Sequence, residues 1–167
     1  PRNRAKQEIS AIGKFLMPGV IDTAVQFDPN GDEMIWCHES RAAVTGGVTT
    51  VVALPGGEHP VVDEATAKRR ARVASKESWC NYALWARATR DNFDALRMAH
   101  ESGYIVGALA YLGGEDGLTV AELKRFVNLP GVLAVQLAEK ELAGDAMKVL
   151  ELAKAMDWPI HVMHLST

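Results

Sequence analysis

The chain has 167 residues, of which 48% are hydrophobic and 23% charged, a composition typical of a globular protein with a sizeable core. Its formal net charge of -3 argues against nucleic acid or an anionic membrane surface as a partner. Two cysteines are too few for a disulfide framework, and no apolar run reaches the ~18 residues of a membrane helix, so we expect a soluble, cytoplasmic protein.

Apolar runs of strand length alternate with segments of helical periodicity along the chain. The expected strands lie at 20–27, 48–55, 81–87, 104–112, 132–138 and 160–166. The expected helices lie between them, at 33–45, 63–77, 91–102, 119–127 and 143–156, the fourth opening with a capping box at Thr119 and Glu122. Because the strands are almost continuously apolar, they predict a parallel sheet that is covered by helices.

Six strand–helix steps fit two α/β architectures: a doubly wound sheet, or a (β/α)8 TIM barrel with about six of its eight units present. No G-x-G-x-x-G motif follows a strand, which argues against a dinucleotide site. Six barrel strands would leave two unpaired edges, so we expect the sequence to be part of a longer chain or to be closed by a partner. Residues 1–17 are expected to form a lead-in and residues 18–167 the barrel segment.

In both architectures, functional side chains gather at the carboxyl ends of the strands. Zinc needs three or more converging ligands there from histidine, aspartate, glutamate or a carboxylated lysine. The histidines near these ends are His59, His161 and His164, which are candidates for a residual ligand or a pocket. His161 and His164 differ by an odd number of positions, so a regular strand would point them to opposite faces.

The chain resembles the cyclic amidohydrolases (dihydroorotases, dihydropyrimidinases and hydantoinases) in three stretches: FLMPGVID–AVQF, ESRAAVTGGVTTVVALPGGEHPVVD and PIHVMHLST. The spacing of these motifs is most similar to that of the dihydroorotase domain in multifunctional pyrimidine-synthesis proteins of animals and fungi. The resemblance runs from Lys14 to Thr167 and implies a barrel of the amidohydrolase type.

The resemblance also implies that the family's metal-binding residues are missing. The D-x-H-x-H motif of the first strand begins here at Asp22, and the sixth-strand histidine is kept as His164. The degenerate metal positions are Ala24 and Gln26 on the first strand, Leu109 on the fourth and Leu137 on the fifth. Alanine and leucine have no donor atom and a neutral amide is a poor zinc ligand, so the zinc of the family is predicted to be lost.

Two substrate-binding positions of the family are changed as well. The arginine that holds the substrate carboxylate in dihydroorotases falls at Asp28, and the asparagine of the following loop falls at Gly56. With a single histidine kept, no metal would be held in a set geometry and no hydroxide would be activated. The resemblance therefore predicts no catalytic residue in this chain.

The favoured interpretation is a catalytically inactive dihydroorotase-like domain with a structural or assembly role in de novo pyrimidine biosynthesis. It implies aspartate transcarbamoylase-like or carbamoyl-phosphate synthetase-like partners or flanking domains, and a homo-oligomer. One alternative is part of an active zinc-dependent cyclic amidohydrolase, which hydrolyses a cyclic amide with ligands supplied from elsewhere. Another is a small-molecule sensor that uses the former active-site cleft.

Several of these residues also have simpler structural interpretations. Asp22 is expected to accept backbone N–H groups, and His164 is expected to be a hydrogen-bonded core histidine. The basic run from Lys68 to Arg72 is expected to be a solvated helix face. Trp85 and Arg87, at alternate positions of the third strand, are expected to fill the barrel interior.

Overall fold

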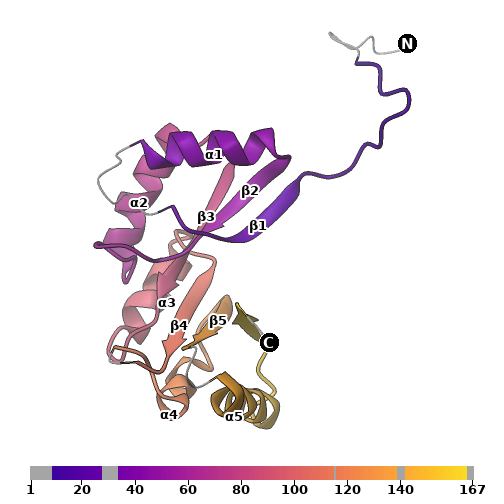
Figure 1. The fold of residues 1–167 in the computed structure, drawn as a ribbon. Coiled ribbons are helices and arrows are strands. Elements are labelled where there is room, and N and C mark those ends of the chain that lie inside the picture. Colours follow the sequence, from indigo (N-terminus) through magenta and orange to yellow (C-terminus); the bar gives the residue numbers. More distant parts are fainter. Residues whose placement is uncertain (1–8, 28–33, 115, 139–141, 165–167) are drawn as a thin grey trace, which may run out of the picture.

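Six parallel strands form one curled sheet in the computed structural model, which describes residues 9–27, 34–114, 116–138 and 142–164 (Figure 1). The strands follow one another in the sheet in chain order: β1 (Val20–Val25), β2 (Val48–Ala53), β3 (Asn81–Arg87), β4 (Gly107–Leu112), β5 (Val132–Leu137) and β6 (Ile160–Met163). A doubly wound sheet would reverse this order part of the way across. The sequential order therefore confirms a partial barrel, of which β1 and β6 are the edges in the described residues.

The helices lie on the outer side of the sheet. They are α1 (Ile35–Thr45), α2 (Glu64–Glu77), α3 (Phe93–Glu101), α4 (Val120–Leu123) with the 3-10 turn η1 (Lys124–Phe126), and α5 (Leu142–Ala155). The helix that the sequence predicts at 119–127 is thus a single α-helical turn that tightens into a 3-10 turn, a common ending for short helices. Every other predicted element is present; β3 has the predicted bounds, and the remaining elements have shifted ends.

Side chains of the strands alternate between two buried clusters. The outer cluster packs beneath the helices and includes Val51, Ala53, Leu84, Ala86, Ala108, Ala110, Leu133 and Val135. We call the other one the inner cluster; it consists of Val52, Leu54, Trp85, Leu109, Ala134 and Met163. Because neighbouring residues of a strand point to opposite faces, this division assigns each strand position to the barrel interior or to the helix layer.

The curl of the sheet is held by contacts across β2 and at β4. The indole Nε1 of Trp85, on β3, donates a hydrogen bond to the backbone carbonyl of Thr23, on β1, at 2.9 Å. Gly107 permits the close approach of β4 to β5, because a Cβ there would overlap the carbonyl oxygen of Val132 and lie 2.9 Å from the Trp85 ring. A tryptophan and a glycine on adjacent strands therefore fit together at the start of β4.

Capping boxes fix the beginnings of two helices. At α2, Asp63 Oδ1 accepts the Thr66 N–H at 2.7 Å, and Thr66 Oγ1 accepts the Asp63 N–H at 3.1 Å. These hydrogen bonds from Thr66, its side chain first, lower the pKa of Asp63. At α4, Glu122 Oε2 accepts the Thr119 N–H at 2.8 Å and Thr119 Oγ1 accepts the Glu122 N–H at 3.2 Å, which confirms the predicted box.

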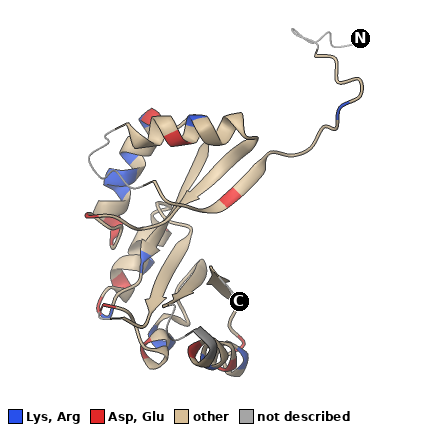
Figure 2. Cartoon of the chain, viewed as in Figure 1, with Lys and Arg blue, Asp and Glu red and all other residues tan. Residues whose placement is uncertain are grey.

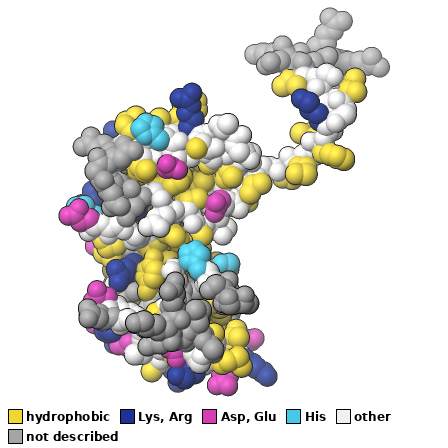
Figure 3. Space-filling model, in the orientation of Figure 1, with side chains coloured by type: hydrophobic (Ala, Val, Ile, Leu, Met, Phe, Trp, Pro, Cys, Tyr) yellow, Lys and Arg dark blue, Asp and Glu magenta, His cyan; other side chains and the backbone are white. Residues whose placement is uncertain are grey.

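Residues 9–19 extend away from the body of the molecule (Figure 1). Hydrophobic side chains follow this segment, among them Phe15 and Leu16, each 96% exposed (Figure 3). The apolar strip continues onto the edge strand, where Val20 and Ile21 are also exposed. In the part of the chain that the structure describes, no helix is both long and apolar enough to cross a membrane.

Most charged side chains lie on helices and loops rather than on the sheet (Figure 2). In the six described strands, the only residues among Asp, Glu, Lys and Arg are Asp22 on β1 and Arg87 on β3. The described strands are therefore almost entirely uncharged.

Candidate functional site at the carboxyl ends of the strands

The first strand places its three candidate residues at the open edge of the sheet. Asp22 is exposed, and its Oδ1 accepts the N–H of Ala24 at 3.1 Å, which confirms the expected role as a backbone acceptor. Ala24 packs against the inner cluster. Gln26 follows the end of β1 and is exposed. A methyl group and an amide thus stand beside Asp22, whose carboxylate is already engaged by its own backbone.

The fourth-strand position, Leu109, lies in a fully buried part of the inner face. Leu109 is 0% exposed and belongs to the inner cluster, together with Trp85, Ala134 and Met163. The side chain that occupies the family's lysine position is therefore a hydrocarbon that fills the barrel interior.

The fifth strand ends differently from what the resemblance implies. Leu137 is 8% exposed and lies in the outer cluster, beneath the helices. Gln136 stands two residues after Ala134 of the inner cluster, so it is the residue at this strand end that faces the barrel interior. It pairs in register with Tyr111 on β4 and with Met163 on β6.

His161 on β6 and His164 directly after it are both exposed. His161 pairs in register with Ala134, which places it on the inner face of the edge strand. His164 follows the strand with a φ of 53°, so strand alternation ends at Met163. No further described strand covers the edge strand, so the expected role of His164 as a hydrogen-bonded core histidine stays a prediction.

The loop between β2 and α2 is tied down by an arginine. Arg70 donates hydrogen bonds to the backbone carbonyls of Leu54, Gly56 and His59, at 3.5, 3.2 and 3.0 Å. The basic run is therefore a solvated face only in part, since Arg70 is half-buried while its neighbours Arg69 and Arg72 are exposed. The His59 side chain is exposed, and Asp28 lies outside the described residues.

Three polar side chains lie on the inner face at the ends of β3, β4 and β5. The Arg87 guanidinium carbon lies 5.4 Å from the centre of the Tyr111 ring, and Tyr111 pairs in register with Gln136. Burial raises the pKa of Tyr111, against the opposing effect of the Arg87 charge. Sequence analysis singled out only Arg87; the signal for the other two is their position, two residues after Leu109 and Ala134.

The donors at these positions do not fit a zinc site. Ala24 and Leu109 have no donor atom, and Gln26 offers a neutral amide. The imidazoles near the strand ends are His59 in the loop after β2, His161 on β6 and His164 just beyond it. Within the described residues, no group of three or more His, Cys, Asp or Glu side chains is placed to hold a metal ion.

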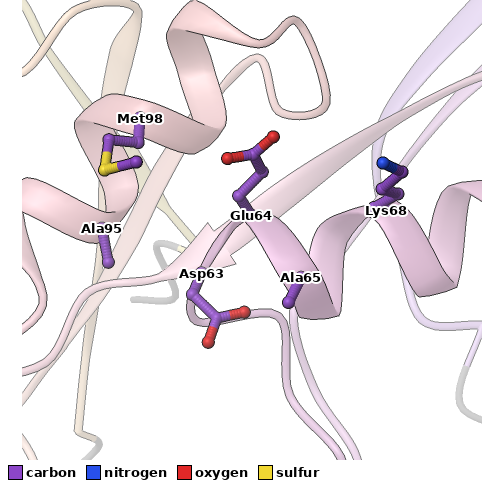
Figure 4. A pocket seen from close by; sticks show the side chains of 6 residues that line it. All are labelled: Asp63, Glu64, Ala65, Lys68, Ala95 and Met98. Atoms are coloured by element: carbon purple, nitrogen blue, oxygen red, sulfur yellow. The ribbon is translucent and has the colours of Figure 1, made fainter.

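Pockets also occur in the helix layer, outside the sheet. One of about 440 Å³ lies between α2 and α3 and is lined by Asp63, Glu64, Ala65, Lys68, Ala95 and Met98 (Figure 4). Its acidic groups have local roles, since Asp63 caps α2 and Glu64 accepts a hydrogen bond from the Ser102 hydroxyl at 3.0 Å. Another, of about 430 Å³, lies between α1 and α2, where Trp36 and Val73 meet His59 and Arg69. His59 is the one candidate histidine that lines either of these two pockets, which agrees with its expected place at a pocket.

The curled sheet and its covering helices define a segment of an amidohydrolase-type (β/α)8 barrel. L-hydantoinase (dihydropyrimidinase) from Arthrobacter aurescens superposes with a TM-score of 0.86 at 22% identity, over 98% of this chain and 45% of that one. The inactive dihydroorotase-like domain of the Chaetomium thermophilum CAD-like multifunctional protein superposes with a TM-score of 0.76 at 16% identity, over 90% and 45% of the two chains.

Sequence relatives include dihydroorotases and a multifunctional protein. A dihydroorotase from Pyrococcus horikoshii is 29% identical over 170 residues, which cover 93% of this chain and 39% of the relative. The multifunctional protein CAD of Squalus acanthias is 25% identical over 158 residues, 90% of this chain and 7% of that protein. No family model matches the chain. The chain is a dihydroorotase-like member of the cyclic amidohydrolase superfamily, and it spans about two fifths of the length of the curated dihydroorotases it matches.

Proposed function

We propose that this chain is the barrel segment of a dihydroorotase-like protein that does not hydrolyse cyclic amides and has a structural or assembly role in de novo pyrimidine biosynthesis. The observation that carries this proposal is the donor set of the inner face. Metal-dependent hydrolysis of an amide requires an activated hydroxide and a Lewis acid, both held by several ligands in a set geometry. Alanine, leucine and amide side chains do not supply those ligands.

The inner face supports a structural role because its apolar residues are packed. Leu109 contributes to a continuous cluster with Trp85 and Ala134, where a lysine would leave a cation to be neutralised. One structural neighbour is described as an inactive dihydroorotase-like domain of a multifunctional protein, which gives an example of a barrel of this fold without activity.

The proposed partners follow from the same relatives. A stretch of a multifunctional protein matches this chain, which supports flanking or partner domains of the aspartate transcarbamoylase or carbamoyl-phosphate synthetase type. The exposed apolar residues of β1 support burial against another part of an assembly, including a homo-oligomer. Sedimentation velocity of the full polypeptide, alone and with the aspartate transcarbamoylase of the same organism, tests this part of the proposal.

The test of inactivity compares the full polypeptide with the Pyrococcus horikoshii dihydroorotase, both purified after growth with zinc. Elemental analysis gives the metal content, and absorbance assays follow ring opening of L-dihydroorotate and hydantoin. We expect no stoichiometric zinc and no turnover above the buffer blank. Stoichiometric zinc together with chelator-sensitive turnover would overturn the proposal and establish the alternative, an active zinc-dependent cyclic amidohydrolase.

A further inference from the structure

An exposed tryptophan is held in place between the end of α2 and the start of β3. Trp79 is 62% exposed, yet its backbone N–H donates a hydrogen bond at 2.9 Å to the hydroxyl of Ser40, which is fully buried on α1. Its indole Nε1 lies 3.4 Å from the Cys37 sulfur, and the Arg41 guanidinium carbon lies 5.7 Å from the centre of its ring. Three contacts to one helix therefore fix a large aromatic side chain that solvent still reaches.

Exposed apolar residues continue from this helix to the edge strand. Arg41 and Val44 are three positions apart on α1, so they lie on the same side of the helix, and Val44 is exposed. The turn after α1 contacts β1, because the Gly47 N–H donates to the Val44 carbonyl and the Gly47 carbonyl accepts the N–H of Val20, both at 3.0 Å. Val20 is exposed as well. Contiguous exposed apolar residues of this kind mark interaction surfaces.

Two opposite charges flank the tryptophan. Arg41 lies over its ring, and Glu77, the last residue of α2, comes two positions before it in the chain. Neither the Arg41 guanidinium nor the Glu77 carboxylate forms an ion pair with a residue that the structure describes. We call the set formed by Val20, Arg41, Val44, Glu77 and Trp79 the Trp79 surface.

The Trp79 surface is suited to a second copy of itself. In a contact with two-fold symmetry the same surface is used by both subunits, so a cation on one copy can face an anion on the other. Its two charges cancel, whereas a strongly charged partner would require an excess of one sign. Tryptophan and arginine dominate the energetics of protein interfaces, and a side chain that is fixed before binding loses little conformational entropy on association.

We propose that the Trp79 surface is a two-fold contact between two copies of this chain, in which Arg41 of each copy faces Glu77 of the other and the tryptophans lie at the centre. The inference rests on the homo-oligomer named in the proposed function, to which it assigns a surface, and it is independent of the loss of hydrolysis. The surface lies where β1 and β3 begin, so the contact leaves the carboxyl ends of the strands accessible.

An exchange of charges tests the contact. Sedimentation velocity of the full polypeptide at micromolar concentrations measures self-association. Arg41→Glu and Glu77→Arg each place like charges opposite one another, so each variant alone should self-associate about tenfold or more weakly than wild type. An equimolar mixture of the two variants, one of them fluorescently labelled, should form a heterodimer with an affinity within about threefold of wild type, because the altered residues then face opposite charges.

Two further variants complete the test. Trp79→Ala should weaken self-association by about tenfold or more. The control is Arg97→Glu, the same reversal at an exposed arginine that pairs with Glu101 on α3, and its association should stay within about twofold of wild type. Thermal melting verifies the fold of each variant.

Three results would overturn the proposal: a wild type that stays monomeric, association that the two charge reversals leave unchanged, or a mixture of these variants that does not restore it. Unchanged association would reject the Trp79 surface alone and leave a homo-oligomer formed through other residues.

Discussion

Replacing Leu109 by lysine restores the residue type that the family carries at this position and places an ammonium group in the inner cluster. Leu109 is 0% exposed and lies in a cluster with Trp85, Ala134 and Met163, whose side chains offer an ammonium group no strong hydrogen-bond acceptor. We therefore expect Leu109→Lys to destabilise the fold strongly, whereas Leu109→Met, which keeps the volume and the apolar surface, should cost less than about 1.5 kcal/mol.

The magnitude for Leu109→Lys follows from proton linkage. A fully buried lysine can have its pKa lowered by about 3–5 units from about 10.4, and each unit corresponds to about 1.4 kcal/mol. At pH 7 the side chain deprotonates rather than remain charged, which limits this cost to about 4–5 kcal/mol. Because the folded pKa is depressed, the unfolded chain binds more protons above that value. The loss of unfolding free energy in Leu109→Lys should therefore be constant below the folded pKa and become smaller as pH rises toward about 10.

Urea unfolding of both variants, followed by circular dichroism at several pH values, measures this difference. We expect the unfolding free energy of Leu109→Lys to be about 4 kcal/mol lower than that of Leu109→Met near neutral pH, and this difference to become smaller in alkaline buffer. A lysine variant as stable as the methionine variant, with no dependence on pH, would show that solvent or an anion reaches the position. That result would refute the description of the inner face as a packed apolar interior.

Three further predictions concern the sheet, a helix cap and the metal positions. Gly107→Ala should lower the unfolding free energy in urea by about 1–3 kcal/mol, because its Cβ would meet a carbonyl oxygen of β5, while Gly56→Ala, which faces open space, should be neutral. Asp63→Ala should lower the unfolding free energy by about 1 kcal/mol in thermal melts at neutral pH. Because the pKa of Asp63 is lowered in the folded state, the wild type loses this stabilisation as pH falls through that pKa. A stability difference between wild type and variant that stays constant down to acidic pH would contradict the role of the cap. Joint replacement Ala24→His and Gln26→His should raise zinc affinity about tenfold in a chelator-competition assay, and unchanged affinity would mean that the two positions do not face one ion.

Periodicity located the elements because the physics behind it is local. Strand alternation and helical stripes reflect burial of one face or two, and Thr119 identified a helix start through its own cap. The ends of elements depend on pairing between strands, which one sequence does not contain. Residues 104–106 have the apolar character of a strand, and Ile105 is buried in the outer cluster, yet β4 begins at Gly107, where ladder pairing with β3 starts.

In the candidate site, too, residue types could be read from the sequence, whereas features that depend on pairing between strands could not. That metal-binding side chains are absent from positions such as Ala24 could be read directly, because the residue types are the evidence. Which face Leu137 takes could not, since it depends on the register of β5 against β4, and a shift of one residue exchanges the two faces. The meeting of Arg87 with Tyr111 depends in turn on the register of β3 against β4. Contacts between strands thus decide what a strand-end residue can do.

The bond from the Trp85 indole to the Thr23 carbonyl has a consequence for how this lineage tolerates change. The hydrogen bond joins β3 to β1 across β2, so it fixes the curvature of the sheet through a side chain and the backbone alone. A shape maintained in this way does not rely on an ion at its centre. At the exposed position Gln26, where the resemblance places a metal ligand, substitutions are then expected to leave this curvature unchanged.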